Sequence, residues 1–194
     1  MDSAIEAVLR QYEQRTGDEM KRMQELPPAE FTKRIDEFLL AVGPATGQLM
    51  NLLIKEAKAR TILELGTSHG YSTVWLAEAT RATGGKVISV DVHAGKQEYA
   101  RTPLSRAGLA EFAEFKLGDA RKAIAALPGP IDFVLLDLWK DLSRGQHDFP
   151  GIFPQGDAED YPTHVRAKAD LQSLLLPVGS GIEVSRCTRG LEFK

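Results

Sequence analysis

The sequence predicts an α/β protein in which a mostly parallel, doubly wound sheet follows a helical N-terminal extension and ends in an antiparallel hairpin. Three observations predict this class. Apolar residues recur at helical spacing over residues 1–60. Short apolar runs then alternate with helical stretches, and two strand-like runs near the C-terminus are joined by Val178-Gly179-Ser180. Nearly continuous apolar strands are typical of sheets that are covered on both faces.

The first 60 residues are expected to be helical. Two amphipathic segments lie on either side of Pro27-Pro28. Their apolar residues are Ala4, Ile5, Val8, Leu9 and Tyr12 in the first segment and Phe31, Ile35, Phe38 and Leu39 in the second. A third helix is expected over 48–59, with Thr46 as its cap and Leu49, Leu52 and Leu53 as its apolar stripe. These stripes fit either a partner subunit or the protein's own core, and the core is the favoured interpretation.

The remaining chain alternates strands and helices. We expect parallel strands at 61–65, 86–91, 113–118 and 131–137 and helices at 72–81, 96–107 and 120–126. Right-handed crossovers then bring the loops after the first and fourth strands together at the carboxyl edge, where ligands bind in open α/β sheets. The runs 171–177 and 181–187 read as an antiparallel hairpin.

The composition excludes several functional classes. The net charge is −3, so the chain lacks the basic field that drives phosphate-backbone binding, and nucleic acid is not an expected partner. No apolar run approaches the roughly 20 residues of a membrane span and the N-terminus carries early acids, so we expect a cytoplasmic protein without a membrane partner. The lone Cys187 is expected to be a buried core thiol.

The turn after the first parallel strand is the first candidate site. Gly66 and Gly70 are spaced G-x-x-x-G and lack the middle glycine of the dinucleotide fingerprint G-x-G-x-x-G. Asp91 ends the next strand, where a carboxylate can accept hydrogen bonds from both ribose hydroxyls. Separately, the glycines could serve close helix packing and Asp91 could be a solvated strand end. Together they favour a site for a nucleoside without a diphosphate.

Four stretches carry a resemblance to a known family. The runs "ILELGTSHGYSTVWLAEA", "GGKVISVDV", "LGDA" and "FVLLDLWKD" resemble the S-adenosylmethionine-dependent O-methyltransferases of the catechol and caffeoyl-CoA type. The most specific of them, LDLWKD, is close to the LDHWKD of catechol O-methyltransferase. The resemblance covers about residues 40–142 and resumes at "LLLPVGSGIEVSR". It implies a Rossmann-like class I methyltransferase sheet of seven strands, and a homodimer as in bacterial relatives.

The resemblance also implies roles for particular residues. Glu64, Gly66 and Gly70 are expected at the methionine end of S-adenosylmethionine, the Ser72 hydroxyl at its carboxylate, and Asp91 at its ribose. The expected neighbours of the adenine and of the methyl donor are Gly118, Asp119, Ala120, Asp137 and Trp139. An ordinary helix N-cap is an equally good reading of Asp119.

Asp137 and Lys140 are the expected catalytic residues. Methyl transfer to oxygen is an in-line displacement, so an enzyme chiefly aligns the reactants and removes the acceptor proton. In the family, a magnesium ion held partly by the residue matching Asp137 lowers the hydroxyl pKa, and the residue matching Lys140 is the base. Asp137 is accordingly the expected metal ligand. His69 lies in the glycine turn, although a single loop histidine more often has no chemical role.

Residues 143–162 depart from the family. They contain three prolines, three glycines and no apolar run of strand length, so a fifth parallel strand is not expected there. No Asp-Asn pair follows to complete the metal site, which makes Mg²⁺ an uncertain cofactor. Either the strand is truly missing, or the sequence omits or alters a segment that the intact molecule contains. A final helix is expected over about 160–169.

These expectations combine into one reading. The chain is a single methyltransferase domain over 1–194, with a helical extension (1–60), cofactor-binding βα units (61–142), an irregular segment (143–162) and a helix end with hairpin (163–194). The expected activity is methylation of a hydroxyl on a small phenolic or catechol-like molecule. The alternative is a catalytically impaired S-adenosylmethionine-binding scaffold. A nicotinamide-dependent dehydrogenase is disfavoured by the missing glycine.

Overall fold

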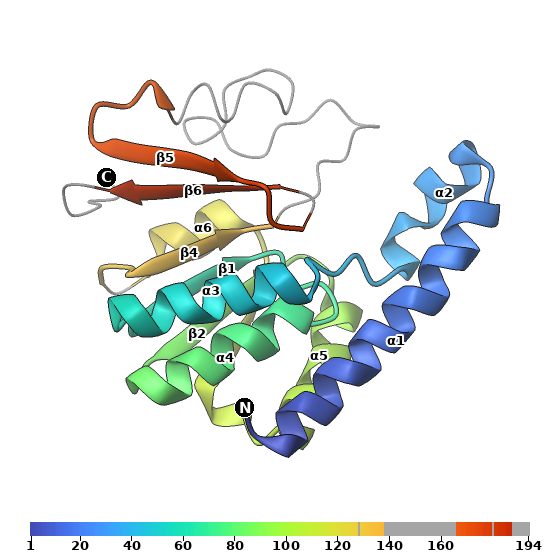
Figure 1. Ribbon diagram of the computed structural model, residues 1–194, viewed down its shortest axis with the longest axis horizontal. Helices are drawn as coiled ribbons and strands as arrows, with labels where there is room; N and C mark the ends of the chain where they lie inside the picture. The colour runs from blue at the N-terminus through green and yellow to red at the C-terminus, as the bar shows by residue number, and fades with distance from the viewer. Residues whose placement is uncertain (128, 138–165, 180, 188–194) are drawn as a thin grey trace.

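The computed structural model describes residues 1–127, 129–137, 166–179 and 181–187 (Figure 1). Its centre is a parallel sheet of four strands in the order β3-β2-β1-β4. The strands are β1 (Thr61–Leu65), β2 (Lys86–Asp91), β3 (Ala113–Leu117) and β4 (Phe133–Leu136). In register, Leu65 pairs with Val90 on one side and with Leu136 on the other, so the carboxyl ends of β1, β2 and β4 lie at one edge. This confirms the predicted α/β class and the adjacency of the first and fourth strands.

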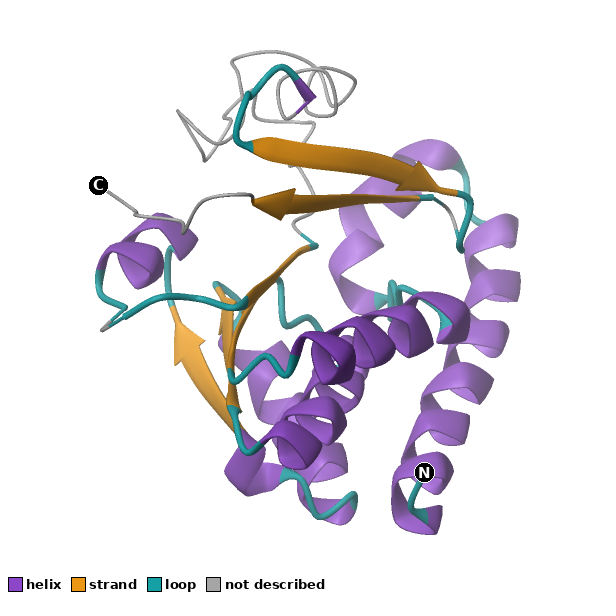
Figure 2. Ribbon diagram, turned by 60° about the vertical axis from the view of Figure 1, so that its left-hand side comes forward, coloured by secondary structure: helices purple, strands orange, loops and turns teal. Residues whose placement is uncertain are grey.

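Helices cover both faces of the sheet (Figure 2). The described residues form the helices α1 (Ser3–Glu25), α2 (Pro28–Arg34), α3 (Pro44–Ala57), α4 (Tyr71–Thr83), α5 (Ala94–Arg106) and α6 (Ala120–Ala125), with short 3-10 turns η1 (Ile35–Glu37) and η2 (Ala110–Phe112). Of these helices, α2 lies away from the sheet (Figure 1). Successive strand residues face opposite sides. Ile62 therefore packs in the core beneath α1, α3, α4 and α5, whereas Leu63 and Leu65 pack in a second core against α6. No helix among the described residues is long and apolar enough to cross a membrane.

The N-terminal helix packs on the protein's own core, as the favoured interpretation predicts. Ile5, Val8, Leu9 and Tyr12 are all buried in the larger core. Asp2 caps the start of α1 by accepting a hydrogen bond from the amide of Ala4. The second predicted segment is α-helical to Arg34 and continues as η1 to Glu37, after which Phe38 is extended and both Phe38 and Leu39 are buried.

Helix α3 differs from the prediction in the residue at which it begins and in which of its side chains are buried. It begins at Pro44, whose missing N–H costs nothing in the first turn, so Thr46 lies inside the helix and not at its cap. Met50 and Ile54 are buried, whereas Leu52 of the predicted stripe is 62% exposed. The close approach of α3 to α4 sets this register, because a Cβ on Gly47 would lie only 2.4 Å from the Trp75 ring.

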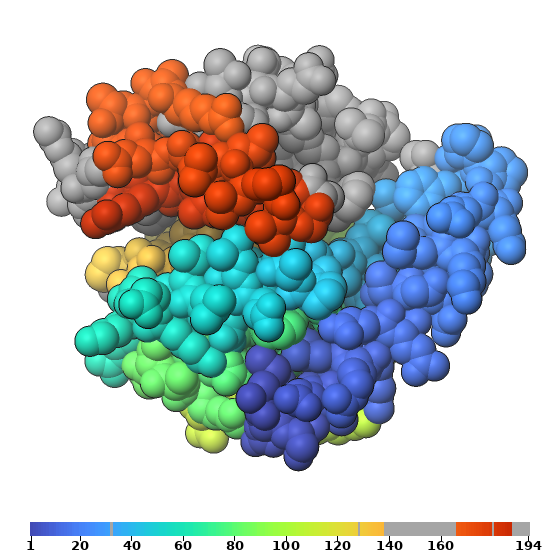
Figure 3. Space-filling view, in the orientation of Figure 1, coloured from blue at the N-terminus to red at the C-terminus, as the bar shows by residue number. Residues whose placement is uncertain are grey.

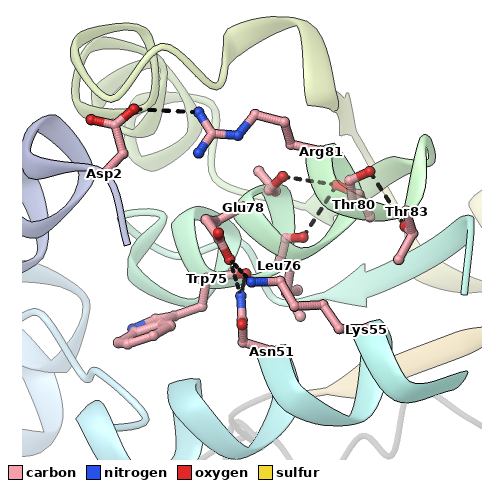
Figure 4. Close-up of polar contacts among 10 residues, drawn as sticks. Asp2, Asn51, Lys55, Trp75, Leu76, Glu78, Thr80, Arg81 and Thr83 are labelled. Carbon is pink, nitrogen blue, oxygen red and sulfur yellow. Dashed lines mark hydrogen bonds and ion pairs between the residues drawn. The ribbon is translucent and has the colours of Figure 1, made fainter. Parts of the chain in front are cut away.

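Buried polar contacts also join α3 to α4 (Figure 4). The carboxylate of Glu78 accepts hydrogen bonds from the Asn51 amide and from the Lys55 ammonium, the latter at 2.6 Å. Asn51 also donates to the Trp75 carbonyl at 2.9 Å. Burial opposes ionisation of Glu78, but these two donors hold its pKa below the ordinary value. The pair of helices is therefore fixed by both packing and charge.

The C-terminal hairpin is present but does not extend the parallel sheet. Strands β5 (Leu171–Leu176) and β6 (Ile182–Cys187) pair antiparallel, as predicted, in a sheet of their own. The hairpin lies beside the start of α3, where a Cβ on Gly179 would be 2.7 Å from the Thr46 hydroxyl (Figure 3). Because the hairpin is separate from both cores, Cys187 is half-buried and not the buried core thiol that was expected. The segment expected to lack a fifth strand, 143–162, lies outside the described residues.

Candidate functional site

The candidate site lies at the carboxyl edge of the parallel sheet. Two backbone hydrogen bonds tie its parts together: Gly66 N–H donates to the Val90 carbonyl, and Asp137 N–H donates to the Leu65 carbonyl, each at 2.9 Å. The turn after β1, the end of β2 and the end of β4 are therefore neighbours. This brings together the glycine turn, Asp91 and Asp137, which lie far apart in the sequence.

The turn over 66–70 has an unusual backbone. Gly66 and Gly70 have φ of +100° and +89°, and Ser68 lies between them at +47°. Such angles are easy for glycine and unfavourable for serine. Gly70 is needed for a second reason, because a Cβ there would lie 2.6 Å from the Cβ of Ala100 on α5. The G-x-x-x-G spacing thus serves both the bend and the close packing of a helix.

Asp91 fixes this turn from the end of β2. Its Oδ2 accepts a hydrogen bond from Ser68 N–H at 2.7 Å, and its Oδ1 accepts one from His93 N–H at 2.9 Å. A carboxylate offers about four acceptor positions, so each oxygen retains a lone pair. Asp91 is half-buried and oriented, which argues against a merely solvated strand end and suits the capture of two neighbouring hydroxyls.

Glu64 lies beneath the turn and is fully buried. Its Oε1 accepts a hydrogen bond from the Ser72 hydroxyl, and its Oε2 accepts from Thr73 and Ser89, all at 2.5–2.6 Å. Burial, and to a smaller degree the charge of Asp137, raises the pKa of Glu64 to about 7 even though the three hydroxyls favour the ionised form.

The hydroxyl protons around Glu64 have a defined direction. Since Ser89 donates to Glu64, it accepts from Thr67 at 2.6 Å. Thr67 in turn accepts from the Gln97 side chain at 3.2 Å. The Ser72 hydroxyl likewise donates its proton to Glu64 when Glu64 is ionised. In that state the Ser72 oxygen can only accept a hydrogen bond from a ligand. The expected contact from Ser72 to a ligand carboxylate, in which the hydroxyl has to donate, stays a prediction.

Asp137 lines a small pocket beside the turn. Burial raises its pKa to about 6. The pocket encloses about 10 Å³, on the order of one water molecule. Its lining is Leu39, Leu40, Ala41, Val42, Thr67, Ser68, His69, Tyr71, Ser72 and Asp137. The pocket is therefore too small for a nucleoside.

His69 is held in place by helix α1. The Tyr12 hydroxyl donates to its carbonyl at 2.6 Å, and Arg15 Nη2 lies 3.5 Å from its Nε2. Burial, followed by the charges of Arg15 and Lys96, lowers the pKa of His69 to about 4, so the ring is neutral at pH 7. Since arginine can only donate, Nε2 is the acceptor and Nδ1 carries the proton, next to the Ser68 hydroxyl at 3.4 Å.

Sequence reasoning missed these contacts from α1. Tyr12 reads as one more apolar position of an amphipathic helix, and nothing local marks its hydroxyl as a partner of a residue 57 positions away. The contact depends on how α1 crosses α4 and α5.

The other predicted residues have mixed outcomes. Gly118 has φ +141° and donates its N–H to the Asp91 carbonyl at 2.9 Å, which places it beside Asp91. Asp119 accepts from Lys122 N–H, which confirms the N-cap and lowers its pKa; Ala120 is the first residue of α6. Trp139 and Lys140 lie outside the described residues.

Among the residues that the structure describes, no three His, Cys, Asp or Glu side chains are grouped to hold a metal.

Comparison with known proteins now shows which proteins the chain resembles. A family model described as a methyltransferase domain matches residues 63–157. Catechol O-methyltransferase of Mycobacterium tuberculosis is 36% identical over 103 residues, covering 53% of this chain and 46% of that protein. Caffeoyl-CoA O-methyltransferase 1 of Nicotiana tabacum is 30% identical over 135 residues, covering 66% of this chain and 55% of that protein. The chain is a relative of the catechol and caffeoyl-CoA O-methyltransferases.

Solved structures agree on the fold of this O-methyltransferase relative. An O-methyltransferase from Bacillus cereus in complex with SAH has a TM-score of 0.61 and 22% identity, and the match covers 91% of this chain and 84% of that one. The O-methyltransferase TomG of Streptomyces achromogenes, in complex with SAM, has a TM-score of 0.65 and 22% identity over 97% and 91% of the two chains. The chain spans about half the length of the curated relatives it matches.

Proposed function

We propose that this protein is an S-adenosylmethionine-dependent O-methyltransferase that acts on a hydroxyl of a small phenolic or catechol-like molecule. The observation that carries the proposal is the junction of the bent turn 66–70 with the oriented carboxylate of Asp91, inside the stretch that matches the methyltransferase domain. The substrates of the named relatives support the acceptor class.

The described residues fit the cofactor at one end. The retained lone pairs of Asp91 suit the two ribose hydroxyls, and Gly66 leaves the backbone open where the methionine part would lie. When bound, S-adenosylmethionine supplies a methyl group already activated by its sulfonium. The protein then has to exclude water, align the acceptor oxygen and accept its proton.

Asp137 and Lys140 are the proposed residues for the acceptor. With its pKa raised to about 6, Asp137 is largely ionised at pH 7 and can accept a hydrogen bond from the acceptor hydroxyl. Lys140 is the proposed base on the basis of the resemblance in LDLWKD. The described residues do not by themselves form a magnesium site, because Mg²⁺ takes about six ligands and Asp137 stands in no group of three carboxyl, imidazole or thiol side chains. No step is therefore derived through a metal.

The proposal is tested by binding and by turnover. Calorimetry should show that S-adenosylhomocysteine binds and NAD does not, and Asp91→Asn should weaken that binding by roughly tenfold or more, the loss expected for a ligand's charge-assisted hydrogen bond. Binding of NAD in preference to S-adenosylhomocysteine would contradict the proposal.

Turnover is measured on a panel of catechols, with Mg²⁺ and after chelation. Lys140→Ala should abolish methyl transfer while cofactor binding persists, and an unchanged rate would remove Lys140 as the base. Cofactor binding without turnover on any acceptor would instead favour the scaffold. The proposal includes a homodimer, which light scattering in solution can measure.

A further inference from the structure

We infer that Tyr12 is a positioning residue for the cofactor-binding turn, its hydroxyl holding the turn 66–70 through the carbonyl of His69. The inference rests on the proposed function, since it concerns how that turn is prepared for its ligand. The residue lies on α1, outside the stretch that matches the methyltransferase domain, so no comparison assigns it a role.

The side chain of Tyr12 is buried, and both its ring and its hydroxyl have close neighbours. The residue is only 3% exposed, and its ring packs edge-on against Tyr71 and Tyr99, with centroids 5.7 and 6.4 Å away. Its hydroxyl donates to the His69 carbonyl at 2.6 Å. It also lies close to Gly70, 3.4 Å from where a Cβ on that residue would be. A buried hydroxyl usually has one best partner, and here that partner is the turn itself.

The turn requires support from outside because its backbone is strained. Ser68 at φ +47° is a left-handed residue other than glycine, an unfavourable state that persists only where the surroundings impose it. Asp91 holds the Ser68 amide from β2. Tyr12 holds the carbonyl of the following residue, His69, from α1, so the turn is clamped by hydrogen bonds to both a strand end and α1.

Neighbouring residues of α1 reinforce the clamp. Arg15 packs its guanidinium over the Tyr99 ring at 5.0 Å and reaches the His69 ring, while its Nε bonds Glu19 at 2.7 Å. Tyr71, the first residue of α4, donates to Glu13 at 3.2 Å. The helix is anchored in the core by Ile5, Val8 and Leu9, so it presents these groups from a rigid support.

The test compares two variants that each remove one hydroxyl. Tyr12→Phe keeps the packed ring and loses the bond to the His69 carbonyl. Thr83→Val is the matched control, because the Thr83 hydroxyl also donates at 2.6 Å to a distant backbone carbonyl, that of Ala59, which precedes β1 at the opposite edge of the sheet. The free energy of unfolding, the Kd of S-adenosylhomocysteine and amide hydrogen exchange are measured for both variants and the wild type.

Both variants should lose stability to a similar degree, because each loses one hydrogen bond. Only Tyr12→Phe should raise the Kd of S-adenosylhomocysteine. The expected increase is about twofold to tenfold, which corresponds to the free energy of one hydrogen bond. Exchange at the amides of Ser68 and Gly70 should speed up in Tyr12→Phe and not in Thr83→Val. Equal Kd values and equal exchange in the two variants would overturn the inference. If the wild type itself does not bind S-adenosylhomocysteine, the proposed function fails first, and the exchange comparison still tests the clamp.

Discussion

Glu64 is a carboxyl group that folding moves from water into a shell of hydroxyls. Three donors at 2.5–2.6 Å compensate part of the lost hydration, yet burial still raises its pKa to about 7. The group therefore changes protonation near neutral pH directly beneath the candidate cofactor turn. The pKa of His69, a residue of the turn, is instead lowered, so its ring stays neutral down to a pH of about 4.

The buried carboxyl predicts how stability depends on pH. Between its ordinary pKa of 4.5 and about 7, the folded protein keeps the Glu64 proton while the unfolded chain releases it. The free energy of unfolding should therefore fall as the pH rises through this window. Glu64→Gln removes that dependence, so its stability should fall by about 2 kcal/mol less than that of the wild type between pH 5.5 and 8.

Urea denaturation at the two pH values measures this difference. Glu114→Gln, which removes a carboxyl from β3 whose side chain is 48% exposed, is the matched control and should follow the wild-type curve. Parallel curves for wild type and Glu64→Gln would show that Glu64 titrates at the same pH in the folded and unfolded chain.

At the scale of elements, helix α4 is capped by a glycine at each end, but the two glycines are constrained differently. Gly70 and Gly84 both lie in the left-handed region, at φ +89° and +70°. A Cβ on Gly70 would meet Ala100 of α5 at 2.6 Å, whereas a Cβ on Gly84 would meet nothing within 4 Å. The first glycine therefore sets both the turn and the distance between α4 and α5, and the second only ends the helix.

Alanine substitutions at the two glycines separate the cost of a left-handed backbone from the cost of a close contact with α5. Gly84→Ala should lower the free energy of unfolding by about 1–2 kcal/mol, the penalty of a left-handed alanine. Gly70→Ala should lose a further 1–3 kcal/mol or so, because the new methyl overpacks the α4–α5 contact. Chemical denaturation of both variants measures the difference, and equal losses would show that Ala100 moves away freely. Only Gly70→Ala should also weaken S-adenosylhomocysteine binding.

At the scale of the whole molecule, the candidate site is assembled from segments that the sheet brings together. β1, β2 and β4 supply the turn, Asp91 and Asp137, and α1 supports them from the side. A ligand at this edge contacts several segments in the folded state and none of them together in the unfolded chain. Binding should therefore stabilise the whole fold.

Thermal unfolding measures this coupling. S-adenosylhomocysteine at about one hundred times its Kd should raise the free energy of unfolding by about 2.7 kcal/mol and Tm by roughly 5–10 °C for a chain of this size. NAD at the same concentration should leave Tm unchanged. A Tm that responds to neither compound would contradict the assignment of the nucleoside site.

The sequence by itself determined the elements and the kind of site. The nearly continuous apolar runs predicted β1, β2 and β4, because such runs are typical of strands covered on both faces. The alternation of strands with helices predicted β3, and the glycine turn between two strand-like runs predicted the hairpin. The order of the glycine turn and Asp91 along the chain placed them at one sheet edge, because parallel strands align their carboxyl ends. These are consequences of local chemistry and of chain connectivity.

Only the tertiary structure decided which groups face each other. The register of α3 follows from the contact of Gly47 with Trp75, so Met50 is buried and Leu52 exposed, against the stripe that the sequence suggested. The hairpin forms a sheet of its own, and the Tyr12 hydroxyl meets a carbonyl 57 residues away. Such contacts depend on the angles at which helices cross and on side-chain packing, and amphipathic periodicity shows only that a face is buried, not what it is buried against.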